Sequence, residues 1–193
     1  MERVGVFGGT FDPVHVGHIV AAADTRAALR LDRVLMVVAG DPWQKRGEVV
    51  ASPADRLALV AAAVEDVEGV EPSAIEIERG EPSVTYDTLS ALAAPERELF
   101  LVLGADAVRN MPTWRQLEET RDLATLVIVE RAGDAHAEAP APAWRVERVT
   151  IPRLDIASRD LRARLAQGDP IDGLVPPAVM RAIAQRGLYN HHR

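Results

Sequence analysis

The stretch Gly8-Gly9-Thr10-Phe11-Asp12-Pro13-Val14-His15-Val16-Gly17-His18 joins a short apolar run, Arg3–Gly8, to a segment of helical periodicity, Val16–Leu29. Adjacent glycines let backbone N–H groups approach a ligand without a Cβ in the way. A helix that begins at such a loop favours an anion at its N-terminus. The stretch therefore predicts a strand, a phosphate-binding turn and a helix in succession.

Two histidines stand at the start of this helix. His15 and His18 are three positions apart, so both side chains can face the same side of the helix. A His-x-x-His pair taken alone is also typical of an incidental pattern or of a partial metal site. The glycine spacing does not match the dinucleotide-binding pattern G-x-G-x-x-G. The residues alone leave these alternatives open.

Beyond this stretch, short apolar runs alternate with longer segments of helical periodicity, which is the pattern of strands joined by crossover helices. The predicted strands are Arg3–Gly8, Arg33–Ala39, Ala74–Glu78, Glu98–Leu103, Leu126–Glu130 and Arg145–Thr150. The predicted helices are Val16–Leu29, Ser52–Val64, Thr85–Leu92, Trp114–Thr120, Arg159–Gln167 and Pro177–Arg186.

This order predicts an α/β fold: one Rossmann-like, doubly wound, mainly parallel sheet with helices on both faces. We expect a single domain over residues 1–193, with a helical C-terminal part from about residue 156 to 193. The Ala- and Pro-rich segment Ala132–Ala143 reads as a loop within that domain. Ligands of such sheets bind beyond the carboxyl ends of the strands, where the strand order reverses.

The composition excludes several classes of function. A formal charge of -7 argues against a broad nucleic-acid-binding face. The chain has no cysteine, which removes disulfides, thiolate nucleophiles and cysteine–zinc sites. No apolar stretch approaches the length of about 18 residues that spans a bilayer. We therefore expect a cytoplasmic protein with neither nucleic-acid nor membrane partners, and the sequence leaves a homo-oligomer open.

The whole string from Gly8 to His18 is more specific than its parts. It resembles the signature of the His-x-Gly-His adenylyltransferase superfamily, and its form is similar to that of the bacterial nicotinate mononucleotide adenylyltransferases. The resemblance implies an enzyme of NAD biosynthesis that transfers the adenylyl group of ATP to nicotinic acid mononucleotide. The alternatives are a relative that uses nicotinamide mononucleotide or phosphopantetheine, and a nucleotide-binding relative with weakened catalysis.

The resemblance also implies roles for individual residues. His18 would contact the α-phosphate in the transition state, and His15 the neighbouring phosphates. Lys45, which is the only lysine in the chain, would be the third catalytic residue, with its ammonium over the phosphates. The remaining expected ATP-binding residues are Gly8, Gly9, Thr10, Phe11, Asp106 for the ribose, Ser158 and Arg162.

Thr85 and Trp114, together with Lys45, would bind nicotinic acid mononucleotide, with Thr85 at the carboxylate and Trp114 against the pyridine ring. The purely structural alternatives are that Thr85 caps the helix, that Trp114 belongs to the core and that Lys45 is a solvated loop residue.

The motif that carries Ser158 departs from the family pattern at Ala157 and Arg159, where hydroxyl-bearing residues are usual. Mg²⁺ is expected as the partner of ATP, held mainly by phosphates and water without a metal site of the protein's own.

Overall fold

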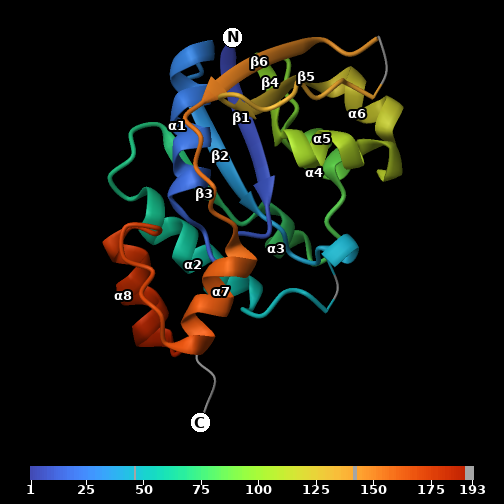
Figure 1. Cartoon of the computed structure of the whole chain (residues 1–193). Helices are drawn as coiled ribbons and strands as arrows, with labels where there is room; N and C mark the ends of the chain where they lie inside the picture. Colours follow the sequence, from blue (N-terminus) through green and yellow to red (C-terminus); the bar gives the residue numbers. More distant parts are fainter. Residues whose placement is uncertain (46, 141–142, 190–193) are drawn as a thin grey trace.

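Parallel strands form one sheet through the centre of the molecule (Figure 1). The computed structural model describes residues 1–45, 47–140 and 143–189, except for the side chain of Lys45. Within this part, six strands pair in the order β3-β2-β1-β4-β5-β6, and every pair is parallel. Their bounds are β1 Glu2–Gly9, β2 Arg33–Val38, β3 Val70–Ser73, β4 Arg97–Gly104, β5 Thr125–Arg131 and β6 Val146–Ile151.

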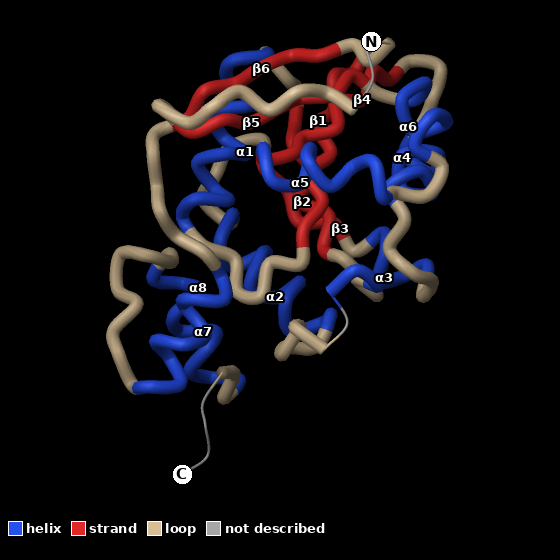
Figure 2. Tube along the Cα trace, turned by 45° about the vertical axis from the view of Figure 1, so that its right-hand side comes forward, coloured by secondary structure: helices blue, strands red, loops and turns tan. Residues whose placement is uncertain are grey.

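Helices cover both faces of the sheet, as Figure 2 shows. Apolar side chains of α1, α2, α7 and α8 pack on one face, and those of α4 and α5 pack on the other with part of α6. The α-helices are α1 Val16–Leu29, α2 Pro53–Val64, α3 Ile75–Arg79, α4 Thr85–Leu92, α5 Ala105–Asn110, α6 Leu117–Leu123, α7 Ser158–Gln167 and α8 Pro177–Arg186. Two short 3-10 helices, η1 Trp43–Lys45 and η2 Met111–Thr113, complete the described elements.

The predicted doubly wound sheet is confirmed. Strand order runs outward from β1 to β2 and β3 on one side, and from β4 to β5 and β6 on the other. The order therefore reverses between β1 and β4, and a crevice forms at their carboxyl ends. The loop that follows β1 begins at this crevice, because β1 ends at Gly9.

The predicted strand Ala74–Glu78 is wrong. The edge strand β3 ends at Ser73, and Ile75–Arg79 forms the short helix α3. The alternation of Ile and Glu imitates a strand, but the carboxylate of Glu76 is buried, where its Oε1 accepts a hydrogen bond from the Thr88 hydroxyl at 2.6 Å. Gly80 then ends the helix in the left-handed conformation, with φ +70°.

The predicted helix Trp114–Thr120 begins too early. Trp114 instead closes η2, because its N–H donates to the Met111 carbonyl at 2.9 Å. Gln116 adopts a left-handed backbone with φ +54°, which no helical residue can have, and α6 starts at Leu117. Helix α5 was not predicted, because its six residues follow β4 directly, with Gly104 as the N-cap.

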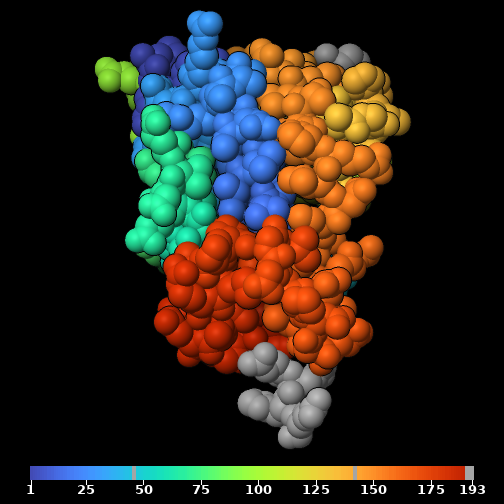
Figure 3. Space-filling view, turned by 60° about the vertical axis from the view of Figure 1, so that its left-hand side comes forward, coloured from blue at the N-terminus to red at the C-terminus, as the bar shows by residue number. Residues whose placement is uncertain are grey.

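The C-terminal helices α7 and α8 lie beyond the carboxyl end of the sheet (Figure 1). In the space-filling view they form a continuous layer, coloured orange to red, against the blue surface of α1 (Figure 3). Val179 and Ile183 of α8 and Leu161 of α7 join the core of the α1 face. Among the described helices, none is both long enough and apolar enough to cross a bilayer.

Candidate functional site

A cavity of about 790 Å³ opens at the reversal of strand order. Its walls come from the ends of four neighbouring strands, from the loop after β1 and from the start of α7. This volume lies within the range of pockets that enclose a small-molecule ligand. Of the residues predicted for ATP, all line it: Gly8, Gly9, Thr10, Phe11, His15, His18, Asp106, Ser158 and Arg162.

The two glycines of the loop serve different purposes. A Cβ on Gly9 would lie 2.6 Å from the Phe11 ring, so the fold itself requires glycine there. A Cβ on Gly8 would meet nothing within 4 Å, and Gly8 lines the cavity without a positive φ. The same is true of Gly104 at the end of the neighbouring strand β4. Because the interior requires neither residue to be glycine, the open space beside both favours a ligand that lies close to the backbone.

His15 and His18 form a stacked pair at the start of α1. Their ring centroids are 3.7 Å apart, with an interplanar angle of 25°. The backbone N–H of His15, the N-cap residue, donates to Nδ1 of His18 at 3.2 Å. A neutral imidazole that accepts at Nδ1 carries its proton on Nε2. Phe11 lies edge-on against His18 with centroids 5.0 Å apart, so the orientation and the tautomer of His18 are both set by its neighbours.

His15 is nearly inaccessible to solvent, with 6% of its surface exposed. Burial, together with the positive charge of Arg131, lowers the pKa of its imidazole from 6.5 to about 4. Its Nδ1 has no hydrogen-bond partner among the described residues. A Cβ on Gly17 would lie 3.1 Å from the His15 ring, so a larger residue there would press on that ring. At neutral pH the His15 ring is therefore uncharged.

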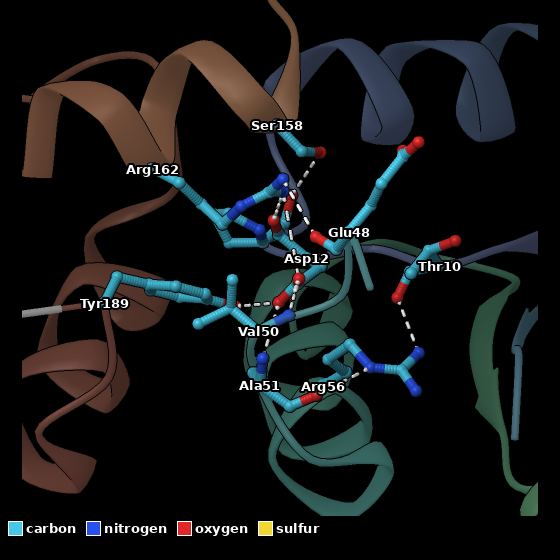
Figure 4. A network of polar contacts seen from close by, with 10 residues as sticks. Thr10, Asp12, Glu48, Val50, Ala51, Arg56, Ser158, Arg162 and Tyr189 are labelled. Carbon is cyan, nitrogen blue, oxygen red and sulfur yellow. Dashed lines mark hydrogen bonds and ion pairs between the residues drawn. The ribbon is translucent and has the colours of Figure 1, made fainter. Parts of the chain in front are cut away.

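A buried carboxylate joins the loop after β1 to the C-terminal helices (Figure 4). Asp12 is 2% exposed, and its Oδ1 accepts from the Tyr189 hydroxyl at 2.7 Å. The backbone N–H groups of Val50 and Ala51 also donate to this carboxylate, at 2.8 and 3.2 Å. Burial and the bond to Asp12 raise the pKa of the Tyr189 hydroxyl far above its usual range, so the hydroxyl remains a donor.

Two of the predicted phosphate-binding residues hold this junction together. The Arg162 guanidinium donates to the carbonyl of Asp12 at 2.6 Å and to that of Glu48 at 3.2 Å. The Ser158 hydroxyl donates to the carbonyl of Pro13 at 2.9 Å. Both side chains are therefore engaged with loop carbonyls at the wall of the cavity.

Arg56 is a structural component of the site that the sequence analysis missed. It is 1% exposed, and its guanidinium donates to three carbonyls: Thr10 at 2.8 Å, Ala39 at 2.8 Å and Ala51 at 3.2 Å. These carbonyls belong to three separate segments beside the cavity. Burial lowers the pKa of the Arg56 guanidinium from its ordinary value. The signal was present, because Arg56 falls on the same helical face as the buried Leu59 and Val60.

Asp106 and Arg159 line the cavity with exposed side chains. Asp106 is 94% exposed and forms an ion pair with Arg109 on the same helix. Arg159 is 83% exposed, with its Nε 3.4 Å from the carboxylate of Asp160. Both residues that depart from the family pattern, Ala157 and Arg159, thus line the cavity, and Arg159 has an acidic neighbour there.

The residues predicted for the mononucleotide lie elsewhere. Thr85 is the first residue of α4, and the N-cap is Val84, so a capping role for Thr85 is wrong. Trp114 is partly buried and packs against the core of the α4 face. Neither residue lines the cavity around His15 and His18. The backbone of Lys45 ends η1, and its side chain lies outside the described part of the chain.

Comparisons with known proteins show which proteins the chain is similar to. The model of the cytidylyltransferase-like family matches residues 6–164. A protein of Streptomyces coelicolor named "Probable nicotinate-nucleotide adenylyltransferase" is 44% identical over 94% of this chain and 98% of its own. A protein of Roseiflexus sp. with the same name is 46% identical, over 96% and 97%. The fold matches that of Plasmodium falciparum nicotinic acid mononucleotide adenylyltransferase complexed with NaAD, with a TM-score of 0.83, 18% identity and 98% of both chains covered.

Proposed function

Since the chain belongs to the cytidylyltransferase-like family, and within it to the nicotinate-nucleotide adenylyltransferases, we propose that the cavity around His15 and His18 is its active site. The enzyme transfers the adenylyl group of ATP to nicotinic acid mononucleotide, a step of NAD biosynthesis. The products are nicotinic acid adenine dinucleotide and pyrophosphate. The observation that carries the assignment of the site is the stacked histidine pair at the start of α1, inside a cavity at the reversal of strand order.

The reaction is an in-line displacement at the α-phosphate. The phosphate of the mononucleotide attacks, and pyrophosphate leaves. Such chemistry depends on positioning and on stabilising charge, and it needs no protein nucleophile. His18 would donate its Nε2–H to the α-phosphate oxygens as charge builds on them. The bond from the His15 backbone N–H to Nδ1 supports this role, because it fixes the donor tautomer before substrate arrives.

Charged and polar side chains would stabilise the departing pyrophosphate. Arg162 and Ser158 start from bonds to loop carbonyls at the cavity wall, and the triphosphate would compete for them. Lys45 follows β2 at the end of η1, and we propose that its ammonium joins them. His15 is neutral at pH 7, so its part would be that of a hydrogen-bonding ring beside the phosphates, without net charge.

The nucleoside ends of the two substrates would bind on either side of this centre. Asp106 is a natural acceptor for the ribose hydroxyls of ATP, because its carboxylate is exposed in the cavity. Thr85, at the start of α4, would receive the nicotinate carboxylate, since a helix N-terminus favours an anion. Trp114 would stack on the pyridine ring once the mononucleotide is bound.

ATP would enter as its magnesium complex, with the ion as part of the substrate. Among the described residues, no three His, Asp or Glu side chains are grouped so as to enclose a metal ion. We propose that the ion is held mainly by phosphate oxygens and water. The ion would draw charge from the phosphates, while the protein's part is to hold their oxygens.

One coupled assay tests the proposal. The purified protein is given ATP and Mg²⁺ with nicotinic acid mononucleotide, nicotinamide mononucleotide or phosphopantetheine, and pyrophosphate release is measured. We expect turnover that is fastest with the nicotinic acid mononucleotide. Preference for either other acceptor would identify a different transferase. Binding of ATP without turnover of any acceptor would identify a nucleotide-binding relative that has lost catalysis.

A further inference from the structure

Arg131 is the last residue of β5 and lines the active-site cavity, although no motif of the sequence pointed to it. Side chains alternate between the two faces of a strand. Val127 and Val129 belong to the core of the α1 face, whereas Leu126 and Ile128 belong to the opposite core. Continuing this alternation places Arg131 on the face of α1, where the histidines lie.

The charge of Arg131 acts on the catalytic centre. Among the described residues, it is the charged group that contributes to the lowered pKa of His15, after burial. A cation that repels a proton at His15 also attracts an anion bound beside that ring. Arg131 therefore has the position and the sign that a phosphate site requires.

Asp155 is the ion-pair partner of Arg131. Nη1 of Arg131 lies 3.6 Å from Oδ1 of Asp155, in the segment that leads to α7. Asp155 also pairs with Arg153 at 3.2 Å, and Arg153 pairs with Asp134 at 3.2 Å. The long pair with Arg131 is partly exposed and hence weak. If Arg131 leaves Asp155 to bind a phosphate, Asp155 still has Arg153 as an ion-pair partner.

The arginines that line this cavity are all paired with carboxylates, with which a bound phosphate would have to compete. Each arginine among its described lining residues has an aspartate there as an ion-pair partner: Arg109 with Asp106, Arg131 with Asp155, Arg159 with Asp160 and Arg162 with Asp12. The Arg109 pair is formed within one helix turn, and the Arg159 pair between adjacent residues. Arg131 and Arg162 each have a partner from another segment, but Arg162 also donates to the carbonyls of Asp12 and Glu48. Release of the Arg131 pair changes no local helix contact.

We propose that Arg131 binds the polyphosphate of ATP, and that Asp155 competes with ATP for its guanidinium. The proposal rests on the proposed function, since it places the ATP phosphates beside His15. A planar guanidinium can offer two parallel N–H groups to phosphate oxygens, which the carboxylate at 3.6 Å does not fully use.

The test measures binding of ATP, in the presence of Mg²⁺ and without an acceptor, by calorimetry. We expect Arg131→Gln to raise the Kd for ATP about tenfold or more, as for loss of a charge-assisted hydrogen bond. Arg153→Gln is the matched control, because it removes an arginine from the same series of ion pairs without lining the cavity. The proposal is overturned if Arg131→Gln weakens ATP by less than about three times the effect of Arg153→Gln.

Asp155→Asn provides a test in the opposite direction. Freed from its competitor, Arg131 should bind ATP more tightly, and the Kd should fall by about twofold or more. Removing a negative charge also strengthens the binding of any anion nearby. The double variant Arg131→Gln/Asp155→Asn therefore separates this general effect from the release of Arg131. We expect the gain to vanish without Arg131, and a gain that persists in full would contradict direct competition.

These outcomes are distinguishable from failure of the proposed function. ATP affinity is read without turnover, and turnover of the wild-type protein with nicotinic acid mononucleotide is measured separately. A wild type that binds ATP through Arg131 but adenylates another acceptor would preserve this inference and refute the acceptor assignment.

Discussion

The buried His15 should make the protein lose stability in mild acid. Its imidazole has a pKa of 6.5 when free and about 4 in the folded protein. As the pH falls through this window the unfolded chain takes up a proton that the folded protein does not, so folding becomes less favourable. The sign is therefore a loss of stability on acidification, and by pH 5 the linked loss is about 2 kcal/mol.

We expect His15→Asn to remove this loss. Asparagine is among the residues preferred at an N-cap, so α1 keeps its start. Urea unfolding at steps between pH 7.5 and pH 5 gives the free energy of unfolding of both proteins, above the range in which most carboxylates titrate. The same substitution at His136, whose side chain is 76% exposed, should leave the loss in place. Wild-type and His15→Asn curves that stay parallel to within about 0.5 kcal/mol, against the expected 2, would refute the reasoning.

Three further predictions concern the reaction. His18→Ala should fold and bind ATP within several-fold of wild type by calorimetry but lose about a hundredfold or more in kcat, because one preorganised donor to developing charge is worth roughly 10²–10³ in rate. His18→Asn keeps an N–H donor and should recover part of the lost kcat. A His18→Ala variant that turns over within tenfold of wild type would remove His18 from the mechanism. The helix that starts at Thr85 should favour nicotinic acid over nicotinamide mononucleotide by at least about tenfold in kcat/KM, and equal use of the two acceptors would contradict the assignment of that helix. Arg159→Thr should raise the KM for ATP about threefold, the effect of an exposed charge, whereas an unchanged KM would mean that the side chain serves only Asp160.

The sequence predicted the parts of the site that depend on local order. The loop from Gly8 to His18 specifies a strand, a turn and a helix from adjacent residues, and α1 begins and ends where its periodicity does. The interpretation failed where a side chain's partner is distant in sequence. The buried carboxylate of Glu76 accepts a hydrogen bond from the Thr88 hydroxyl, and an alternating sequence pattern cannot reveal that contact.

The missed residues of the site show the same limit. Arg56 binds carbonyls from three segments, and only the fold brings those carbonyls together. Arg131 lay on a face that strand alternation alone could have identified, but which face carries the histidines depends on the path of α1. The proposed roles of Lys45, Thr85 and Trp114 in binding nicotinic acid mononucleotide stay predictions. Thr85 and Trp114 do not line the cavity around the histidines.

The bond between Asp12 and Tyr189 has a consequence for the way the protein is made. These residues are 177 positions apart, so the nascent chain holds the glycine loop and both histidines long before their partner is synthesised. Until Tyr189 leaves the ribosome, the Asp12 carboxylate lacks its hydroxyl donor, and closing so long a loop is a late event in folding. The loop that carries the glycines thus gains this partner only after nearly the whole described chain has been synthesised.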